Sequence, residues 1–183
     1  MRELSPIQAA RNLDEIVRLL NDFDIPYIVI GGLALSVWGK PRTTLDIDFL
    51  VMANEVDLKR FSKKASTHGI KIDRKWSKWN PLLRGQQIRF RKGELLIDIL
   101  TPRDEHDRQA ILRKKKKRLR GRLYNFISAE DFILQKIKVG RPRDFEDAVS
   151  VLEEMRGKLN LSYLKRWARR LGVLSELNYI NNL

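Results

Sequence analysis

The segment Tyr27-Ile28-Val29-Ile30-Gly31-Gly32, followed after thirteen residues by Asp46-Ile47-Asp48, decides the fold. Residues 27–30 are a short apolar, β-rich run, and glycines directly after such a run indicate a buried strand that ends in a turn. A helix beginning near Leu33 would present free N–H groups and the positive end of its dipole at these glycines. The segment therefore predicts a phosphate-binding turn, although a Gly-Gly pair after a strand is more often a turn without a ligand.

Asp46 and Asp48 are spaced so that both carboxylates lie on the same face of one strand, because successive side chains of a strand alternate. Their Cα atoms would be about 6–7 Å apart at a rise of ~3.3 Å per residue, so both can reach one cation. Two unpaired carboxylates on an apolar strand repel each other and resist burial. A magnesium ion removes both problems, and Mg²⁺ is commonly held by one or two carboxylates together with substrate phosphates.

A third carboxylate, Asp98, interrupts the apolar strand predicted at residues 94–100. If that strand lies beside the strand of Asp46 and Asp48, the three aspartates form one catalytic and metal-binding cluster for Mg²⁺ or Mn²⁺. Asp98 would then ligate a second ion and help deprotonate an attacking hydroxyl. The plainer alternative is that Asp98 pairs with one of the many arginines. A phosphate-binding turn and a metal site together suit a nucleoside triphosphate.

Mixed α and β elements come first along the chain, and helices follow, which predicts an α+β fold with a mixed β-sheet flanked by helices and a mainly helical C-terminal part. We expect a catalytic core at residues 1–127 and a helical part at 128–183 that packs on it. Hydrophobic periodicity and breakers predict the elements. The expected helices are 6–23, 33–38, 56–68, 104–118, 129–139, 143–156 and 161–171, and the expected strands are 27–30, 45–51, 70–76, 86–91, 94–100 and 122–127.

The composition narrows the functional classes. The chain has 183 residues, with 37 Lys and Arg against 23 Asp and Glu, and its net charge of +14 favours a polyanionic partner. The absence of cysteine excludes disulfide scaffolds, cysteine nucleophiles and thiolate zinc sites, and two histidines make a histidine-rich metal site improbable. No apolar run approaches eighteen residues and the N-terminal segment has no signal-peptide core, so we expect no membrane span and a cytoplasmic protein.

A basic run at residues 113–122 holds eight Lys and Arg residues, which is over half of the net charge. Such a run is usually a solvated face. Its place between the expected catalytic strands and the later helices also makes it a candidate contact for the RNA backbone. The candidate nucleic-acid-binding residues are Lys114, Lys115, Lys116, Lys117, Arg118 and Arg120.

A second basic zone, at residues 71–91, contains Trp76 and Trp79. Aromatic side chains among cations can stack nucleobases. More often such tryptophans belong to a core or to a dimer contact, and both readings stay open here.

The run Ile30-Gly31-Gly32 with the later Asp46-Ile47-Asp48 and Asp98 resembles the signature of the DNA polymerase β-like nucleotidyltransferase superfamily. The fuller segment, residues 31–48, is similar to the small prokaryotic nucleotidyltransferases grouped with AbiEii/AbiGii abortive-infection toxins. Residues 128–136 and 140–147 resemble the nucleotide-contacting helix and the helix start of that group. The chain departs from the group at Gly32, where many of its members carry serine.

The resemblance implies a role for each matching residue. Asp46, Asp48 and Asp98 would be catalytic, with Asp98 as third ligand or base, and Lys136 would contact the phosphates. Either Asp144 or Asp147 would match the late aspartate of the toxin group, although both could instead pair with Arg141 and Arg143. Arg42 could anchor phosphate or pair with Asp46. The expected nucleotide-binding residues are Gly31, Gly32, Arg42, Thr43, Lys136, Asp144 and Asp147.

The expected function is transfer of a nucleoside monophosphate to an acceptor hydroxyl, with Mg²⁺ or Mn²⁺ as cofactor. The positive charge favours RNA, such as a tRNA, as acceptor, and the toxin resemblance implies a possible antitoxin partner. One alternative is a catalytically degenerate protein of the same fold that binds nucleic acid or an antitoxin. Another is an enzyme that modifies a small-molecule antibiotic, against which the charge of +14 argues.

Overall fold

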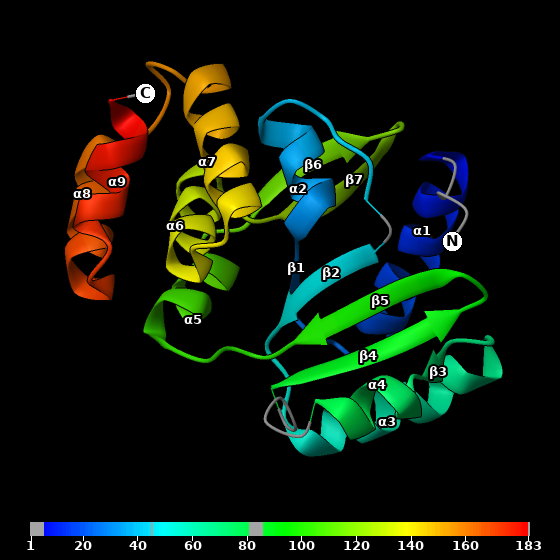
Figure 1. The fold of residues 1–183 in the computed structure, drawn as a ribbon. Coiled ribbons are helices and arrows are strands. Elements are labelled where there is room, and N and C mark those ends of the chain that lie inside the picture. The colour runs from blue at the N-terminus through cyan, green and yellow to red at the C-terminus, as the bar shows by residue number, and fades with distance from the viewer. Residues whose placement is uncertain (1–5, 45, 81–85, 183) are drawn as a thin grey trace.

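A computed structural model describes residues 6–44, 46–80 and 86–182, with the backbone alone for residues 6–11. Within this part of the chain, one mixed sheet contains β1 (Tyr27–Ile30), β2 (Asp46–Val51), β3 (Lys71–Ile72), β4 (Gln87–Lys92), β5 (Leu95–Leu100), β6 (Lys115–Leu119) and β7 (Arg122–Phe126). The strand order is β3-β4-β5-β2-β1-β7-β6 (Figure 1). The predicted α+β class is confirmed.

Helices flank this sheet, and the last four lie together at one end of the molecule (Figure 1). The predicted helical region after the last strand is therefore present. The helices are α1 (Pro6–Asp22), α2 (Gly31–Trp38), α3 (Glu55–Thr67), α4 (Arg74–Trp79), α5 (Glu105–Leu112), α6 (Ala129–Val139), α7 (Pro142–Glu154), α8 (Leu161–Leu171) and α9 (Leu174–Asn181).

The centre of the sheet is built from short apolar strands. β1 is buried at all four positions, between antiparallel β2 and parallel β7. β2 pairs in parallel with β5, and β4 pairs antiparallel with β5. Phe49, Phe90 and Phe126 are fully buried on three of these strands. This packing fixes the register, because a shift by one residue would turn every apolar side chain to the opposite face.

The strand predicted at residues 70–76 is wrong in its second half. Only Lys71–Ile72 pair with β4, and α4 begins two residues later. Asp73 stops the strand because its side chain accepts a hydrogen bond from the amide of Trp76 at 3.0 Å. An aspartate in this position caps a helix N-terminus, and the local cap prevails over the strand pattern.

The helix predicted at residues 104–118 is also wrong beyond Leu112. The lysines that follow form β6, an edge strand paired with β7. Arg120 and Gly121, at φ +50° and +82°, make the two-residue turn between these strands. Positive φ at both turn positions suits the twist of a hairpin, and lysines on an edge strand discourage pairing with another chain.

Two further differences concern helix starts and ends. α2 begins at Gly31, two residues before the predicted start at Leu33, and α9 follows the last helix that the sequence predicts. In α9, Leu177 and Ile180 are buried, at the spacing of one helix face. Among the described helices, none has the length and apolar character needed to cross a membrane.

Candidate active site

The sheet register places the predicted acidic residues together. Ile30 is opposite Asp48 across β1 and β2, and Asp48 is opposite Asp98 across β2 and β5. Asp46 lies two residues before Asp48 and therefore on the same face of β2. Carboxylate oxygens of Asp46, Asp48 and Asp98 all lie within 4.8 Å of one another. We call these three residues the triad.

Gly31 brings the start of α2 directly against the triad. It has φ +62°, and a Cβ atom added to it would lie 1.9 Å from Oδ2 of Asp48. The position therefore requires glycine for conformation and for space. No side chain caps the N-terminus of α2, so its first N–H groups have no side-chain acceptor among the described residues.

Thr44 orients the first aspartate of the triad. Its Oγ1 donates a hydrogen bond of 2.6 Å to Oδ1 of Asp46. A Cβ atom on Gly32 would lie 2.7 Å from both Cβ and Oγ1 of Thr44. Because Gly32 and Thr44 are so close, any side chain at position 32 would require Thr44 to move. The serine that many members of the toxin group carry there would therefore not fit in this chain with Thr44 in its present position.

Asp48 has an altered protonation. Burial, followed by the negative charges of Asp46 and Asp98, raises the pKa of Asp48 to about 8, although Lys136 and Arg89 lower it. Because Asp48 retains its proton near neutral pH, the triad has too little positive charge nearby to keep all three carboxylates ionised. Three oxygen donors close together are the ligand set that Mg²⁺ or Mn²⁺ prefers, so the triad fits a divalent cation.

Arg89 supplies one fixed positive charge to the triad. Its Nε and Nη2 donate to the two oxygens of Asp98 at 2.8 and 2.6 Å. The two residues are opposite each other in register, and the side chain of Asp98 is 4% exposed. The guanidinium carbon of Arg89 also lies 4.7 Å from the ring centroid of Trp76. Asp98 is thus both a member of the triad and the partner of an arginine, so the two readings of this residue are compatible.

Lys136, Asp144 and Asp147 lie together beside the triad. Nζ of Lys136 is 2.8 Å from Oδ1 of Asp144 and 2.8 Å from Oδ2 of Asp147. Asp144 also accepts from Nε of Arg141 at 3.0 Å. Burial raises the pKa of Asp147, but hydrogen bonds from Arg42 and Lys136 outweigh it, and the net pKa is below the ordinary value.

Arg42 binds a different aspartate from the one that the sequence suggests. It donates from Nε and Nη2 to the two oxygens of Asp147 at 2.8 and 2.9 Å, so the pairing with Asp46 is wrong. The side chain crosses from the loop before β2 to α7 because Asp147 is buried and needs a partner there. Thr43, next to it, lines the same cleft as the triad.

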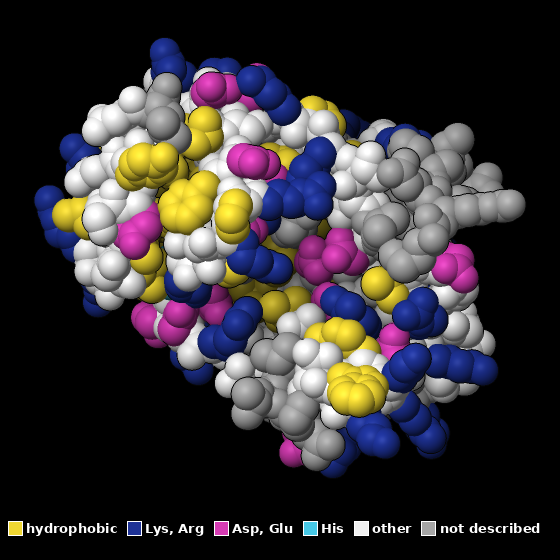
Figure 2. All heavy atoms as spheres, in the orientation of Figure 1, with side chains coloured by type: hydrophobic (Ala, Val, Ile, Leu, Met, Phe, Trp, Pro, Cys, Tyr) yellow, Lys and Arg dark blue, Asp and Glu magenta, His cyan; other side chains and the backbone are white. Residues whose placement is uncertain are grey.

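The triad lines one cleft of about 1190 Å³ between the sheet and the helices α5, α6 and α7, together with Gly31, Gly32, Arg42, Thr43, Lys136 and Asp144, whereas Asp147 is not among its lining residues. Figure 2 shows a hollow in the middle of the face that holds acidic side chains and has Lys and Arg around it. Sequence reasoning missed Arg89, Thr44, Arg103 and Lys138 in this cleft. For Arg89 there was a signal, since the strands predicted at residues 86–91 and 94–100 are separated by only two residues, and strands so close in sequence commonly pair as a hairpin.

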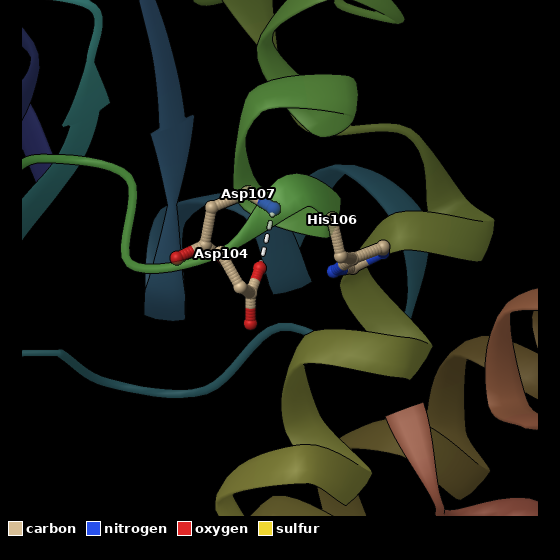
Figure 3. Close-up of side chains that lie close together, drawn as sticks. All are labelled: Asp104, His106 and Asp107. Atoms are coloured by element: carbon tan, nitrogen blue, oxygen red, sulfur yellow. Dashed lines mark hydrogen bonds between the residues drawn. The ribbon is translucent and has the colours of Figure 1, made fainter. Parts of the chain in front are cut away.

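A second acidic group lies at the start of α5 (Figure 3). Asp104 caps the helix by accepting from the amide of Asp107 at 2.9 Å, and oxygens of both residues lie 2.8 and 3.0 Å from Nζ of Lys138. His106 lies nearby, with Nε2 3.2 Å from Oδ1 of Asp131. Lys138 contacts both carboxylates, and the backbone amides of Asp107 and Arg103 donate to them as well, so this group has a structural explanation without a bound metal ion.

The basic run lies outside the cleft. Lys114 to Arg120 belong to or flank β6 at the edge of the sheet, and none of them is among the described residues that line the cleft. Within the run, Nζ of Lys117 lies 4.4 Å from the ring centroid of Trp38 on α2. The predicted nucleic-acid contact therefore has a surface separate from the triad.

Comparison with known proteins supplies the family. The profile of the family described as "Nucleotidyltransferase of unknown function (DUF6036)" matches residues 8–181. A comparison with curated protein sequences gives no match.

Solved structures share the fold at low sequence identity. The lincosamide antibiotic adenylyltransferase LnuA, bound to lincomycin, has a TM-score of 0.58 at 15% identity, over 82% of this chain and 98% of that one. The antibiotic-resistance factor ANT(2'')-Ia gives 0.62 at 12%, over 96% and 99%. An antigenic nucleotidyltransferase-like protein from Paracoccidioides brasiliensis gives 0.59 at 15%, over 96% and 94%. At these identities, the similarity concerns the fold.

Proposed function

Because this chain belongs to the nucleotidyltransferase family described as being of unknown function (DUF6036), we propose that it transfers a nucleoside monophosphate from a nucleoside triphosphate to an acceptor hydroxyl. The observation that carries the proposal is the register that brings Asp48 opposite Asp98, directly beside Gly31. In this reaction the acceptor hydroxyl loses its proton to solvent, and a bond forms between its oxygen and the α-phosphorus. The bond from that phosphorus to the bridging oxygen breaks, and pyrophosphate leaves.

Asp46, Asp48 and Asp98 are the proposed ligands of Mg²⁺ or Mn²⁺. When bound, such an ion supplies Lewis-acid activation of the attacking oxygen and neutralises charge on the phosphates. The chain itself prepares the ligands: Thr44 fixes Asp46 and Arg89 fixes Asp98. Because both oxygens of Asp98 already accept from Arg89, we favour the ligand role of Asp98 over the role of base.

The phosphates are proposed to lie at the N-terminus of α2. The amides that begin at Gly31 and Gly32 have no side-chain cap, and a helix N-terminus attracts anions. Lys136 lies on the same cleft and acts electrostatically on Asp48. A triphosphate would compete with Asp144 and Asp147 for the ammonium group of Lys136, so these aspartates hold the lysine in place until the nucleotide binds.

The charge of the cleft supports an anionic acceptor, and we propose RNA. Seven basic and six acidic residues line the cleft, and three of the acidic ones form the triad. The other three, Asp104, Asp107 and Asp144, each have a lysine ammonium within 3.0 Å. Arg103 and Arg143 are exposed on the rim and suit phosphate groups.

An antibiotic acceptor is the second candidate, because two structures with the same fold are antibiotic adenylyltransferases or resistance factors by their titles. A cationic antibiotic requires unpaired carboxylates. Outside the triad, each carboxylate of the described cleft is paired with lysine, which favours RNA.

Residues 31–48 are similar to the AbiEii/AbiGii group, which supports a further proposal that the chain is the toxin of a toxin–antitoxin pair. In that case an antitoxin protein is the partner, and the basic run on β6 is available for contact with the RNA backbone. A degenerate protein without activity is disfavoured because all three carboxylates of the triad are present and adjacent.

The test is incubation of the protein with Mg²⁺, each α-labelled nucleoside triphosphate, and either total RNA, total protein, lincomycin or tobramycin. We expect label in RNA only. Label in an antibiotic would show that the acceptor is a small molecule and not RNA, while the proposed nucleotidyl transfer would still hold. Absence of label in every acceptor, with no triphosphate binding by calorimetry, would support the degenerate alternative.

A further inference from the structure

α4 displays an aromatic ring among positive charges. The side chain of Trp79 is 75% exposed, the highest exposure among the large hydrophobic residues that the structure describes. Arg74, Lys75 and Lys78 on the same helix are also exposed, and the helix contains no acidic residue. Figure 2 shows hydrophobic side chains next to Lys and Arg over this part of the molecule, below the hollow.

Although α4 is short, it is held at both ends. Asp73 caps its first turn and also forms an ion pair with Arg91 at 3.1 Å. At the other end, Nδ2 of Asn80 donates to the carbonyl of Trp76 at 2.9 Å. The backbone that carries Trp79 is therefore fixed, so a ligand that stacks on the ring would not have to order the helix first.

The helix is also connected to the triad by direct contacts. Trp76 and Trp79 are three residues apart and so share one side of the helix. The ring of Trp76 lies 4.7 Å from the guanidinium carbon of Arg89, which lines the cleft and holds Asp98. Trp79 is thus one helical turn away from the residue that contacts the cleft-lining Arg89.

We propose that Trp79, with Arg74, Lys75 and Lys78, forms a stacking platform for the single-stranded nucleic acid that brings the acceptor hydroxyl to the triad. The inference rests on the proposed function, because it assigns the binding of that acceptor. An exposed indole offers a face to any nucleobase, and the three exposed cations suit the phosphates between bases. A partner protein would have to bury these three cations, so the charge favours a polyanion.

The test measures binding without catalysis. A short fluorescein-labelled single-stranded oligoribonucleotide is titrated with the protein, without nucleotide or metal, and followed by anisotropy. Trp79→Ala should weaken binding about five- to 150-fold, the range for loss of one base–aromatic stack. Trp79→Phe should recover most of the affinity, whereas Trp79→Leu, which keeps an apolar side chain without a π face, should not.

Charge is tested with a matched pair of double variants. Lys75→Gln with Lys78→Gln should lower the slope of log affinity against log salt by about 1.4, since single strands lose about 0.7 per phosphate contact. Lys165→Gln with Arg169→Gln removes the same charge from the exposed face of α8 and should change the slope by less than half as much. Thermal unfolding of each variant checks that it is folded. Because Trp79 is largely exposed, its replacement should leave the unfolding midpoint near that of wild type.

The outcomes separate the platform from the proposed function. Loss of RNA binding in Trp79→Ala supports the platform even if no label transfer is found. Unchanged RNA affinity in Trp79→Ala overturns the platform, even if the wild-type protein transfers label to RNA and so supports the proposed function. Equal losses in both double variants would overturn it too, as would equal affinities of Trp79→Leu and wild type, which would indicate apolar docking in place of stacking.

Discussion

Gly31 lies so close to Asp48 that a Cβ atom on the glycine would be 1.9 Å from the carboxylate oxygen Oδ2. Gly31→Ala therefore combines two costs: about 1–2 kcal/mol for an L-residue at positive φ, and displacement of a triad ligand. We expect reduced stability together with loss of Mn²⁺ binding, measured by urea unfolding and calorimetry.

Gly93→Ala is the matched control for this prediction. Gly93 has φ +58°, but nothing lies within 4 Å of its Cβ position. It should show the conformational cost and normal Mn²⁺ binding. Equal Mn²⁺ affinities in the two variants would contradict the close approach of Gly31 to Asp48.

The pKa of Asp48 makes stability depend on pH. Burial and the charges of Asp46 and Asp98 raise this pKa to about 8, so between about pH 4 and pH 8 the folded protein binds a proton that the unfolded chain has released. The free energy of unfolding of the metal-free protein should therefore fall as pH rises through this window, by up to about 1.4 kcal/mol per pH unit. Urea unfolding at several pH values measures the slope.

Asp48→Asn should remove that contribution to the slope, because asparagine does not titrate. A slope that is the same in Asp48→Asn and wild type would show that other groups cause it. In wild type, binding of Mg²⁺ near neutral pH should release a proton, which calorimetry in buffers of different ionisation enthalpy detects.

Arg89 and Arg91 lie on the same strand but have different partners. Arg89 forms two hydrogen bonds with Asp98, whose side chain is 4% exposed, so Arg89→Gln leaves a buried carboxylate without its cation. Loss of one partner of a buried pair costs about 3–5 kcal/mol. Arg91 is 47% exposed and pairs with Asp73, so Arg91→Gln should cost no more than about 1 kcal/mol. Equal unfolding midpoints for the two variants would argue against the role of Arg89.

Lys136 and Lys138 are two lysines of α6, each bound by two aspartates. Lys136→Gln should weaken triphosphate binding about 10- to 150-fold, if a charged hydrogen bond to phosphate is worth about 1.5–3 kcal/mol. The fold should survive because Asp144 keeps Arg141 and Asp147 keeps Arg42. Lys138→Gln should lower stability and leave triphosphate affinity near that of wild type. If Lys138→Gln instead weakened triphosphate binding more than Lys136→Gln does, the phosphates would lie at Lys138, beside Asp104 and Asp107.

The sequence predicted the triad's geometry because each part depends on local periodicity. Alternation along β2 puts Asp46 and Asp48 on one face, and the cost of a carboxylate in an apolar strand marks Asp98. The glycines mark the strand end because only a residue without Cβ fits against Asp48. These rules mark each residue locally, but the meeting of Asp98 with Asp48 also requires that β2 and β5 pair, which the sequence analysis could only assume.

The partners of the charged residues could not be predicted in the same way. Arg42 contacts Asp147, more than a hundred residues away, and this pairing depends on how α7 packs beside α2. The edge strand β6 was missed because a run of lysines has no apolar period, and its state is set by the hairpin turn at Arg120 and Gly121. Asp73 ended a strand through one side-chain cap, which periodicity does not reveal.

The most direct test of the central claim compares Asp46→Asn with Glu154→Gln, an equivalent change on the exposed face of α7. Both variants are incubated with Mg²⁺, RNA and α-labelled triphosphate, and incorporated label is counted. Asp46→Asn should lose metal-dependent transfer while its unfolding midpoint stays near that of wild type, and Glu154→Gln should keep transfer. Full transfer by Asp46→Asn would contradict the assignment of the triad as the catalytic centre.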